Sequence, residues 1–372
     1  MARINLKLLV IVLSLALLAG FTMAFYLLFF YITPQVGRGV ALSNPVLDNK
    51  GLANDSFQNS LTVNRDRTVK LIFFGDLMID RNVKTKIDKY GMNYLFAQVA
   101  SSSEWQNVIT SDLVIANLEG AVTNGGKHYQ PDMAYDFAFA PERINELKNY
   151  GFNSFNIANN HLADQGENGI IETNKNLDEL DIFYFGCNDK QVGECSARIK
   201  EISGKKIGFA GFSMVYGELN KDKVVSEIKN LKAKSDLVIV NIHWGEEYQH
   251  QFNKKQQDLA YVMIDAGADI IIGHHPHVVQ GVEIYKNKPI FYSLGNFIFD
   301  QYFSQDTQEG LGLAIESNSS DNRILLLPLK SKASQLELIV GYEKEKFLNK
   351  FISWSKLTDE QSKQISFGEI EL

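Results

Sequence analysis

The sequence predicts an α/β fold in which a buried sheet is enclosed by helices. From Thr68 onward, short apolar runs alternate with amphipathic stretches of helical period, which is typical of α/β layers. The apolar runs are continuous, as expected for strands covered on both faces. Five of them also end in a carboxylate, carboxamide or imidazole group, which is typical of a ligand site at the carboxyl ends of the strands.

Composition limits the classes of function open to the chain. Its 372 residues are 45% hydrophobic and 22% charged, which is ordinary for a globular protein and enough for one large core or two modest ones. The net charge of −7 excludes the broad basic surface that nucleic-acid binding requires, so we expect no nucleic-acid partner. Five lysines gather within residues 221–234, a pattern more typical of a solvated helix face than of a polyanion site.

The first expected element is a long apolar segment near the N-terminus. Residues 8–32 read LLVIVLSLALLAGFTMAFYLLFFYI, without an acidic or basic side chain. At about 1.5 Å per helical residue, this segment exceeds a hydrocarbon layer of roughly 30 Å. Arg3 and Lys7 precede it, so the positive-inside rule places the N-terminus in the cytoplasm. Residues 1–32 are therefore expected to form a single-pass anchor in the cell membrane, with an extracytoplasmic main domain in a periplasm or at the cell surface.

A cleaved signal peptide is the alternative for this segment. Signal peptides have an apolar core of roughly 7–15 residues, followed by a small-residue cleavage site. The apolar segment here is longer, and the aromatic cluster near its end suits a membrane interface. An uncleaved anchor is therefore favoured.

The middle of the chain contains the folded domain, expected over residues 68–342. Residues 33–67 lack hydrophobic periodicity and are rich in Asn, Asp, Ser and Gly, so we interpret them as a linker. The expected strands read, in chain order, TVKLIFFGD, SDLVIANLE, FNSFNIANNH, KKIGFAGF, SDLVIVNIHWG, ADIIIGHHPH and KPIFYSLGN.

Helices are expected between these strands, over residues 141–151, 167–180, 221–234 and 255–267. Pro141 suits a helix start, and Gly151 and Gly267 suit helix ends. Residues 324–340 are compatible with a hairpin, and residues 343–372 are expected to form a helix with a polar end.

Two cysteines, Cys187 and Cys195, lie close together in the segment GCNDKQVGEC. Outside the membrane they could pair and close a short polar loop. This pairing is favoured over two free thiols.

The ends of the apolar runs carry side chains that can bind metals. In chain order they are Asp76, Glu119, Asn160 with His161 and Asp164, His243, and His274 with His275 and His277. Each residue alone also fits a turn, a cap or an ion pair. Because loops at the carboxyl ends of strands converge on one crevice in α/β folds, we expect these residues to share one site. Oxygen and nitrogen ligands without cysteine suit one or two divalent ions such as Mn, Zn or Fe.

Six motifs occur in order between residues 69 and 301. They read GDLMIDRNV, NLEGAVTN, IANNHLADQG, NIHWGEEY, GHHPHVVQGVEIY and PIFYSLGNFIFDQ. Together they resemble the CapA/PgsA family of poly-γ-glutamate capsule biosynthesis proteins, which is similar in turn to calcineurin-like metallophosphoesterases. The resemblance implies a four-layer α-β-β-α sandwich of the metallophosphoesterase type, with two mixed sheets flanked by helices.

The resemblance also implies roles for individual residues. The metal ligands would be Asp76, Glu119, Asn160, His243, His275 and His277. His274 would replace His275 if the register shifts by one residue. His161, with Asp164 beside it, would act as the catalytic acid or charge stabiliser. The chain departs from the superfamily at Met78, where a second ligand histidine would stand, so one ion, two ions or a site for a chain of carboxylates remain open.

For function, the resemblance implies a part in making, exporting or anchoring poly-γ-glutamate. The partners would be membrane-bound synthase subunits, namely an amide ligase and a small multi-span protein. The chain has no Gly-x-x-x-x-Gly-Lys-Ser/Thr loop, so we expect it not to be the ATP-using subunit. Three hypotheses remain: an accessory protein that binds or processes the polymer in a metal-containing cleft, a metal-dependent hydrolase of a phosphoester or γ-amide, and a non-catalytic scaffold.

Overall fold

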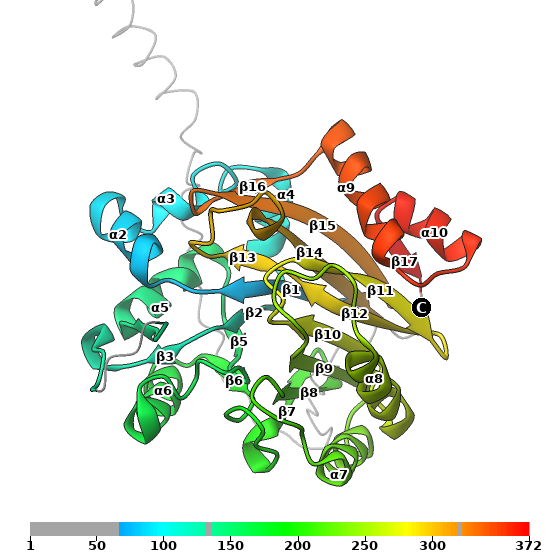
Figure 1. Ribbon diagram of the computed structural model, residues 1–372, viewed down its shortest axis with the longest axis horizontal. Coiled ribbons are helices and arrows are strands. Elements are labelled where there is room, and N and C mark those ends of the chain that lie inside the picture. Colours follow the sequence, from blue (N-terminus) through cyan, green and yellow to red (C-terminus); the bar gives the residue numbers. More distant parts are fainter. Residues whose placement is uncertain (1–66, 131–134, 319–321, 372) are drawn as a thin grey trace, which may run out of the picture. The chain divides into compact units, whose positions relative to one another are not determined.

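Two large sheets form the centre of the protein, seen in a computed structural model that describes residues 67–130, 135–318 and 322–371 (Figure 1). The mixed α/β fold expected from the sequence is confirmed. The expected anchor in residues 1–32 and nearly all of the expected linker lie outside the described residues. Among the helices that are described, none combines the length and apolar character needed to cross a membrane.

The larger sheet has β1 (Val69–Leu77) near its middle. On one side of β1 the pairing is parallel, through β2 (Leu113–Leu118), β5 (Ser154–Asn156) and β6 (Phe183–Phe185). On the other side it is antiparallel, through β14 (Glu309–Ser317), β15 (Asn322–Lys332) and β16 (Gln335–Leu338). Two short strands complete the sheet: β13 (Asn296–Ile298) beside β1, and β17 (Glu369–Glu371) beside β15.

The second sheet has a parallel centre with an antiparallel strand at each edge. Its strands, in spatial order, are β11 (Val279–Tyr285), β12 (Lys288–Leu294), β10 (Ile270–His274), β9 (Leu237–His243), β8 (Lys205–Ser213) and β7 (Ala197–Ile202). The pairs β12–β10, β10–β9 and β9–β8 are parallel. A separate small pair joins β3 (Ala121–Val122) to β4 (Ala138–Phe139).

Helices cover the outer faces of both sheets (Figure 1). The larger sheet is covered by α2 (Arg81–Tyr90), α3 (Asn93–Phe96), α4 (Ser103–Ile109), α5 (Pro141–Leu147) and α6 (Gly166–Glu179). The second sheet is covered by α7 (Lys221–Lys232) and α8 (Lys254–Ala266). Short 3-10 turns lie at η1 (Asn124–Gly126), η2 (Lys148–Tyr150), η3 (Glu194–Ser196) and η4 (Asp306–Gln308).

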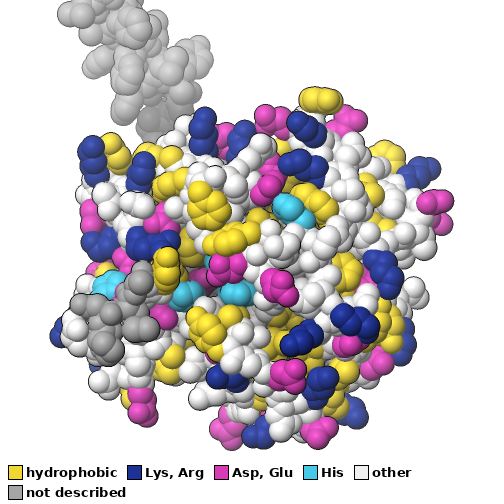
Figure 2. All heavy atoms as spheres, in the orientation of Figure 1, with side chains coloured by type: hydrophobic (Ala, Val, Ile, Leu, Met, Phe, Trp, Pro, Cys, Tyr) yellow, Lys and Arg dark blue, Asp and Glu magenta, His cyan; other side chains and the backbone are white. Residues whose placement is uncertain are grey.

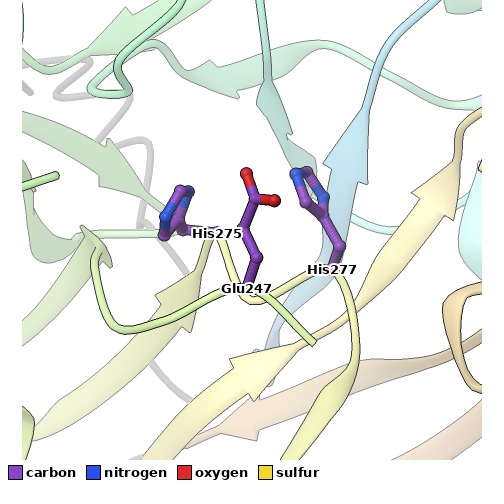
Figure 3. Close-up of side chains that lie close together, drawn as sticks. All are labelled: Glu247, His275 and His277. Atoms are coloured by element: carbon purple, nitrogen blue, oxygen red, sulfur yellow. The ribbon is translucent and has the colours of Figure 1, made fainter. Parts of the chain in front are cut away.

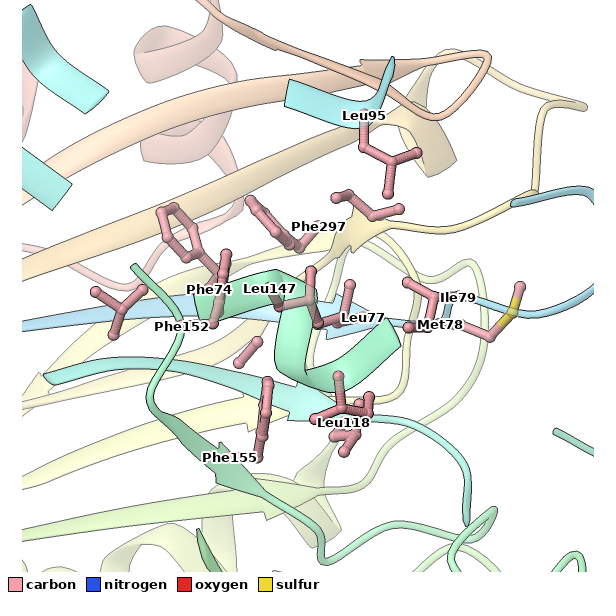
Figure 4. Close-up of a cluster of buried hydrophobic side chains, with 14 of the residues drawn as sticks. Phe74, Leu77, Met78, Ile79, Leu95, Leu118, Leu147, Phe152, Phe155 and Phe297 are labelled. Carbon is pink, nitrogen blue, oxygen red and sulfur yellow. The ribbon is translucent and has the colours of Figure 1, made fainter. Parts of the chain in front are cut away.

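Alternation along the strands separates three hydrophobic cores. In β1, Leu71 and Phe73 face the core between the two sheets, while Ile72 and Phe74 face the helices α2 to α6. Figure 4 shows Phe74 within the core on the helix side. In β9, Ile239 faces the core between the sheets and its neighbours face α7 and α8. Successive side chains of a strand point to opposite faces, so each central strand contributes to two cores. The result is four layers: helices, sheet, sheet and helices.

The C-terminal segment belongs to this core, which differs from the expected polar end. The last residues form α9 (Gly341–Trp354), α10 (Asp359–Ser366) and β17. Phe347, Phe351 and Ile365 pack into the core between the two sheets. The expected helix is therefore present as α9, and the mostly polar residues after it form α10 and β17, where amphipathic spacing buries Ile365 under a polar surface.

Two smaller expectations, a disulfide bond and a hairpin, are also confirmed. Cys187 and Cys195 form a disulfide bond, with 5.2 Å between their Cα atoms, so the favoured alternative holds. The hairpin expected over residues 324–340 is formed by β15 and β16. The C-terminal region also covers His250, whose half-buried ring stacks on Trp354 with 4.0 Å between ring centroids.

Candidate metal centre

The carboxyl ends of the parallel strands bring distant polar residues into rows. In the larger sheet, Asp76 of β1 is in register with Asn117 of β2, which is in register with Asn156 of β5. In the second sheet, His243 of β9 is in register with His274 of β10. Parallel strands end at the same edge of a sheet, and here the two edges face each other across the site.

Gly75 allows the backbone before Asp76 to approach the second sheet closely. A Cβ atom at this position would lie 1.9 Å from the carbonyl oxygen of Gly295. The next backbone N–H, of Asp76, donates to that same oxygen at 3.0 Å. The Gly-Asp pair at the end of β1 therefore has a steric reason, since only glycine fits where the chain passes this close to another backbone.

Asp76 lies at the centre of the contacts in the site and is fully buried. One carboxylate oxygen accepts a hydrogen bond from Asn117 Nδ2 at 2.8 Å, and the other accepts one from the backbone N–H of His275 at 3.2 Å. Nδ1 of His274 and Nδ1 of His277 lie 3.4 and 3.5 Å from the carboxylate. Burial raises the pKa of Asp76, but the interactions with His274 and His277 outweigh burial and hold the pKa well below its usual range. Asp76 is therefore a carboxylate at neutral pH.

Glu119 follows β2 and is also fully buried. Its Oε1 atom lies 3.7 Å from Nε2 of His161 and 3.7 Å from Nε2 of His277, but accepts no hydrogen bond from the described residues. Burial and the negative charge of Asp76 raise the pKa of Glu119 to about 8. Glu119 therefore binds a proton more readily than an exposed glutamate does.

His243 presents a free ring nitrogen to the site. Its Nδ1 lies 3.2 Å from Asn117 Nδ2, and its buried Nε2 has no hydrogen-bond partner in the described part of the chain. Burial, together with the neighbouring His275, lowers the pKa of His243 well below its usual range. The imidazole is therefore neutral, which is the form that binds metals.

His275 and His277 lie in the tight loop after β10, and both have backbone angles in the left-handed region, with φ of 97° and 57°. Such conformations cost on the order of 1–3 kcal/mol each in non-glycine residues, and they concentrate at functional sites. Burial lowers the pKa of His275 to about 3. Burial also lowers the pKa of His277, but the charges of Glu119 and Asp76 outweigh burial and raise it to about 9.

Two groups of ligand atoms converge in this region. Asp76, Glu119 and His243 form a buried group, and Glu247, His275 and His277 form a second group at its exposed side (Figure 3). Within each group the potential ligand atoms lie within 4.8 Å of one another. Figure 3 shows the side chains of the second group pointing into the same space.

The donor atoms in these groups fit a divalent cation. Glu119 Oε1, His243 Nε2 and His275 Nδ1 are buried without a hydrogen-bond partner among the described residues. Burying such an atom unpaired costs about 1–3 kcal/mol, so several together in one place are unusual in a folded protein. Glu119 and His243 belong to the first group and His275 to the second, so a cation in each group would give these residues a partner. Carboxylate with imidazole suits Mn, Zn or Fe.

The proposed acid–base residues form a separate pair beside the first group. Nδ1 of His161 lies 2.8 Å from Asp164 Oδ2, which also accepts a hydrogen bond from the backbone N–H of Phe137 at 2.8 Å. Burial lowers the pKa of His161, but the bond to Asp164 and the charge of Glu119 outweigh burial and raise it. Burial raises the pKa of Asp164. Nε2 of His161 faces Glu119, so a proton held there is next to the site.

Two further candidate ligands, Asn160 and His274, have hydrogen-bond contacts outside the two ligand groups. Asn160 has a buried Oδ1 without a partner among the described residues, and its Nδ2 donates to Tyr216 at 3.4 Å. Its role as a ligand stays a prediction. His274, the alternative for a shifted register, lies near Asp76, but its Nε2 is 3.2 Å from Asn241 Oδ1, and it belongs to neither ligand group.

Glu247 was not among the residues predicted from the sequence. It lies four residues beyond His243, in the loop that continues the NIHWGEEY motif. The signal available in the sequence was the acidic pair Glu246–Glu247, which follows two residues after a strand that ends in a candidate ligand.

The site opens into a cavity of about 600 Å³. Its lining includes Arg81, Asn160, His161, Tyr216, Glu247 and His277. Figure 2 shows histidine and acidic side chains close together near the middle of one face, bordered by hydrophobic ones. A cavity of this size is typical of sites for small ligands or for segments of larger ones.

Cation binding is expected to strengthen as the pH rises, because a cation binds the deprotonated forms of its ligands. Glu119, with a pKa of about 8, and His277, with a pKa of about 9, carry protons at lower pH that the cation must displace. Calorimetric titration of the full-length protein with Mn²⁺, in buffers of different ionisation enthalpy, measures this proton release. An affinity that stays constant from about pH 6 to 9 without proton release contradicts the assignment.

The chain is similar to proteins of capsule synthesis. Residues 70–301 match the model of a family described as "Bacterial capsule synthesis protein PGA_cap". The capsule biosynthesis protein CapA of Bacillus anthracis is 35% identical over 272 residues, which cover 68% of this chain and 64% of that protein, less than two thirds of its length. The PGA biosynthesis protein CapA of Bacillus subtilis is 34% identical over 262 residues, covering 66% of this chain and 67% of that protein.

Among solved structures, a phosphatase from Mycoplasma pneumoniae aligns with a TM-score of 0.42 and 18% identity. The alignment covers 73% of this chain and 93% of that chain.

Proposed function

Because the chain belongs to the bacterial capsule synthesis protein family, we propose that it takes part in the synthesis or export of capsular poly-γ-glutamate. In this proposal it acts beside membrane-bound synthase subunits, an amide ligase and a small multi-span protein. The two Bacillus relatives are named for capsule or PGA biosynthesis, which supports this role. The chain lacks a nucleotide-binding Gly-x-x-x-x-Gly-Lys-Ser/Thr loop, which supports an accessory part in the complex.

The proposed location is the outer side of the cell membrane, with residues 1–32 as the anchor. The apolar segment 8–32 is long enough to span a bilayer. The disulfide bond between Cys187 and Cys195 supports an oxidising compartment, because such bonds are rare in the cytosol.

The proposed working part is the metal centre and its cavity, where the polymer is bound or processed. The observation that carries this proposal is the convergence of buried ligand atoms from both sheets, without partners among the described residues, beside an open cavity lined by Glu247 and His277. Asp76, Glu119 and His243 would hold one cation, and Glu247, His275 and His277 a second. A bound cation would supply a Lewis acid that polarises a carbonyl or phosphoryl oxygen of the substrate.

Hydrolysis of a phosphoester or of the γ-amide is the second candidate function, and the pairing of His161 with Asp164 favours it. Asp164 fixes the imidazole through Nδ1 and leaves Nε2 directed at the site. With a raised pKa, His161 carries a proton near neutral pH and can donate it to a leaving group.

Surface polymer is expected to fall to a small fraction in a strain whose protein carries both Asp76→Ala and His275→Ala. These changes remove one ligand from each group. The measurement compares capsule in a deletion strain complemented with the wild type, the double variant and His128→Ala. His128 pairs with Asp80 and Asp136 and lies outside both ligand groups, so its variant, at equal protein level, is expected to restore the capsule. Normal capsule from the double variant, at equal protein level, would leave only the scaffold hypothesis.

A further inference from the structure

A second cavity of about 700 Å³ lies beside the one that opens from the metal centre. The two cavities share four lining residues, Tyr135, Asn160, His161 and Tyr216. They are therefore two parts of one groove that passes His161. The metal centre lies under one part, and the second part leads away from it.

Exposed aromatic side chains border the junction between the two parts. Tyr135 is 71% exposed and Tyr216 is 68% exposed, although tyrosine is a residue type that is usually well covered. Tyr216 also accepts a hydrogen bond from Asn160, whose Oδ1 atom remains buried without a partner among the described residues. Exposed aromatic groups beside an unpaired polar atom are typical of a surface that contacts a ligand.

Lys190 supplies a positive charge to the second cavity. Its side chain is exposed, and its ammonium group forms no ion pair within the described ranges. Its methylene groups pass close to Gly217, where a Cβ atom would lie 2.7 Å from Lys190 Cδ. The lysines of α7 do not line this cavity. A local positive charge matters here, because the net charge of −7 would otherwise repel an anionic chain.

The wall that carries Lys190 is held in place by several bonds. The disulfide bond closes residues 187–195 into a loop, and the backbone N–H of Lys190 donates to Ser213 at 2.9 Å. In the same loop, Asp189 accepts hydrogen bonds from the backbone N–H groups of Val215 and Tyr216, at 2.9 and 3.1 Å. The disulfide loop and the loop of Tyr216 are thus joined, so the second cavity has a preorganised wall.

The carboxylates that line the second cavity are occupied by donors inside the protein. Asp164 accepts from the backbone N–H of Phe137 and faces His161. Asp189 accepts from Ser213 Oγ as well as from the two backbone groups. Their oxygens are therefore hydrogen-bonded within the protein, whereas the ammonium group of Lys190 has no ion-pair partner within the described ranges.

We propose that the second cavity is a binding subsite for a linear polyanion with regularly spaced carboxylates, and that Lys190 pairs with one carboxylate of the segment beyond His161. The groove then holds an interior stretch of the chain across the metal centre, and a free chain end is not required. This inference rests on the proposed function, because poly-γ-glutamate is the polymer that it names.

The test measures how the affinity for γ-linked glutamate oligomers depends on their length. Full-length protein in detergent is titrated with a dimer, a pentamer and a decamer. The wild type is expected to bind the decamer about tenfold more tightly than the dimer. Lys190→Gln should weaken decamer binding by about fivefold to tenfold, which is the loss expected for one hydrogen bond to a charged group, and so remove most of the gain with length. It should leave dimer binding unchanged. Lys190→Arg should keep the gain.

The matched control is Lys363→Gln, which makes the same charge change at an exposed position of α10. α10 leads into β17, which belongs to the half of the larger sheet on the other side of β1 from the groove. Equal losses in Lys190→Gln and Lys363→Gln would overturn the role of Lys190. Equal affinity of the wild type for all three lengths would overturn the subsite but leave the proposed function intact. Failure to bind any oligomer would count against the proposed function itself, and the subsite would fall with it.

Discussion

The His243→Ala variant is expected to bind a divalent cation about 100-fold more weakly than the wild type, or worse. Loss of a residue that merely supports a ligand costs about 10–100-fold in metal affinity, and His243 is placed as a direct ligand. Its buried Nε2 atom has no hydrogen-bond partner in the described part of the chain, and a ring nitrogen of His243 lies within 4.8 Å of ligand atoms of Asp76 and Glu119. Without it, two carboxylates remain in that group.

The measurement is the metal content of the purified full-length protein, followed by titration with Mn²⁺ and Zn²⁺. His161→Gln is the informative control, because His161 lies beside the site but belongs to neither ligand group. This variant should keep the cation. Together with a capsule assay it also separates binding from processing, since only processing needs the proton of His161. Equal metal loss in both variants, or none in His243→Ala, would contradict the assigned ligands.

Gly75→Ala is expected to destabilise the protein by about 3 kcal/mol or more, at the upper end of overpacking in a core. The new Cβ atom would lie 1.9 Å from the carbonyl oxygen of Gly295, and that neighbour is backbone, which cannot rotate away. Either β1 or the turn at Gly295 must move, and the hydrogen bond from Asp76 N–H to Gly295 would break. Because Asp76 is the next residue, cation binding should weaken together with stability.

Denaturation in urea, with and without Mn²⁺, measures both effects. Gly193→Ala is the matched control, since no atom lies within 4 Å of the place a Cβ would take there and the backbone is extended, with φ of −177°. That variant should stay within about 0.5 kcal/mol of the wild type. A Gly75→Ala protein of wild-type stability and metal affinity would show that the close approach at Gly295 is not needed.

The convergence of Asp76, Glu119 and His243 was predictable because each residue lies at or just after the carboxyl end of a predicted strand. Continuous apolar runs indicate parallel buried strands, and the carboxyl ends of such strands lie at one edge. Residues more than 160 positions apart could therefore be assigned to one place from their position in the runs alone. The same reasoning did not reach Glu247, which lies in a loop where no strand register sets the direction of the side chain.

Where similar residues stand side by side, the sequence did not show which of them would face the site. Asn159 donates to Leu118 at 2.8 Å and accepts from the N–H of His161, which leaves neighbouring Asn160 with the unpaired oxygen. His274 continues β10, whereas His275 takes a left-handed backbone conformation that turns the chain. Such dihedral angles depend on the packing around the loop and leave no periodic trace in the sequence.

The C-terminal region shows that composition alone does not locate the end of a folded domain. Polar residues dominate residues 355–372, so a polar end was expected, yet Ile365 and Ile370 are buried. Leu357 packs against the same core, but so few apolar positions do not stand out from a polar background.

The position of β14 in the larger sheet limits how short an expressed fragment of this protein can be. The match to the family model ends at residue 301, but the neighbour of β1 on its antiparallel side is β14, which begins at Glu309. A fragment limited to the matched residues would leave β1 with unpaired backbone groups along one side, open to pairing with other chains. The folding unit therefore extends past the matched residues, because the strand that carries Asp76 is covered on this side only once β14 has been synthesised.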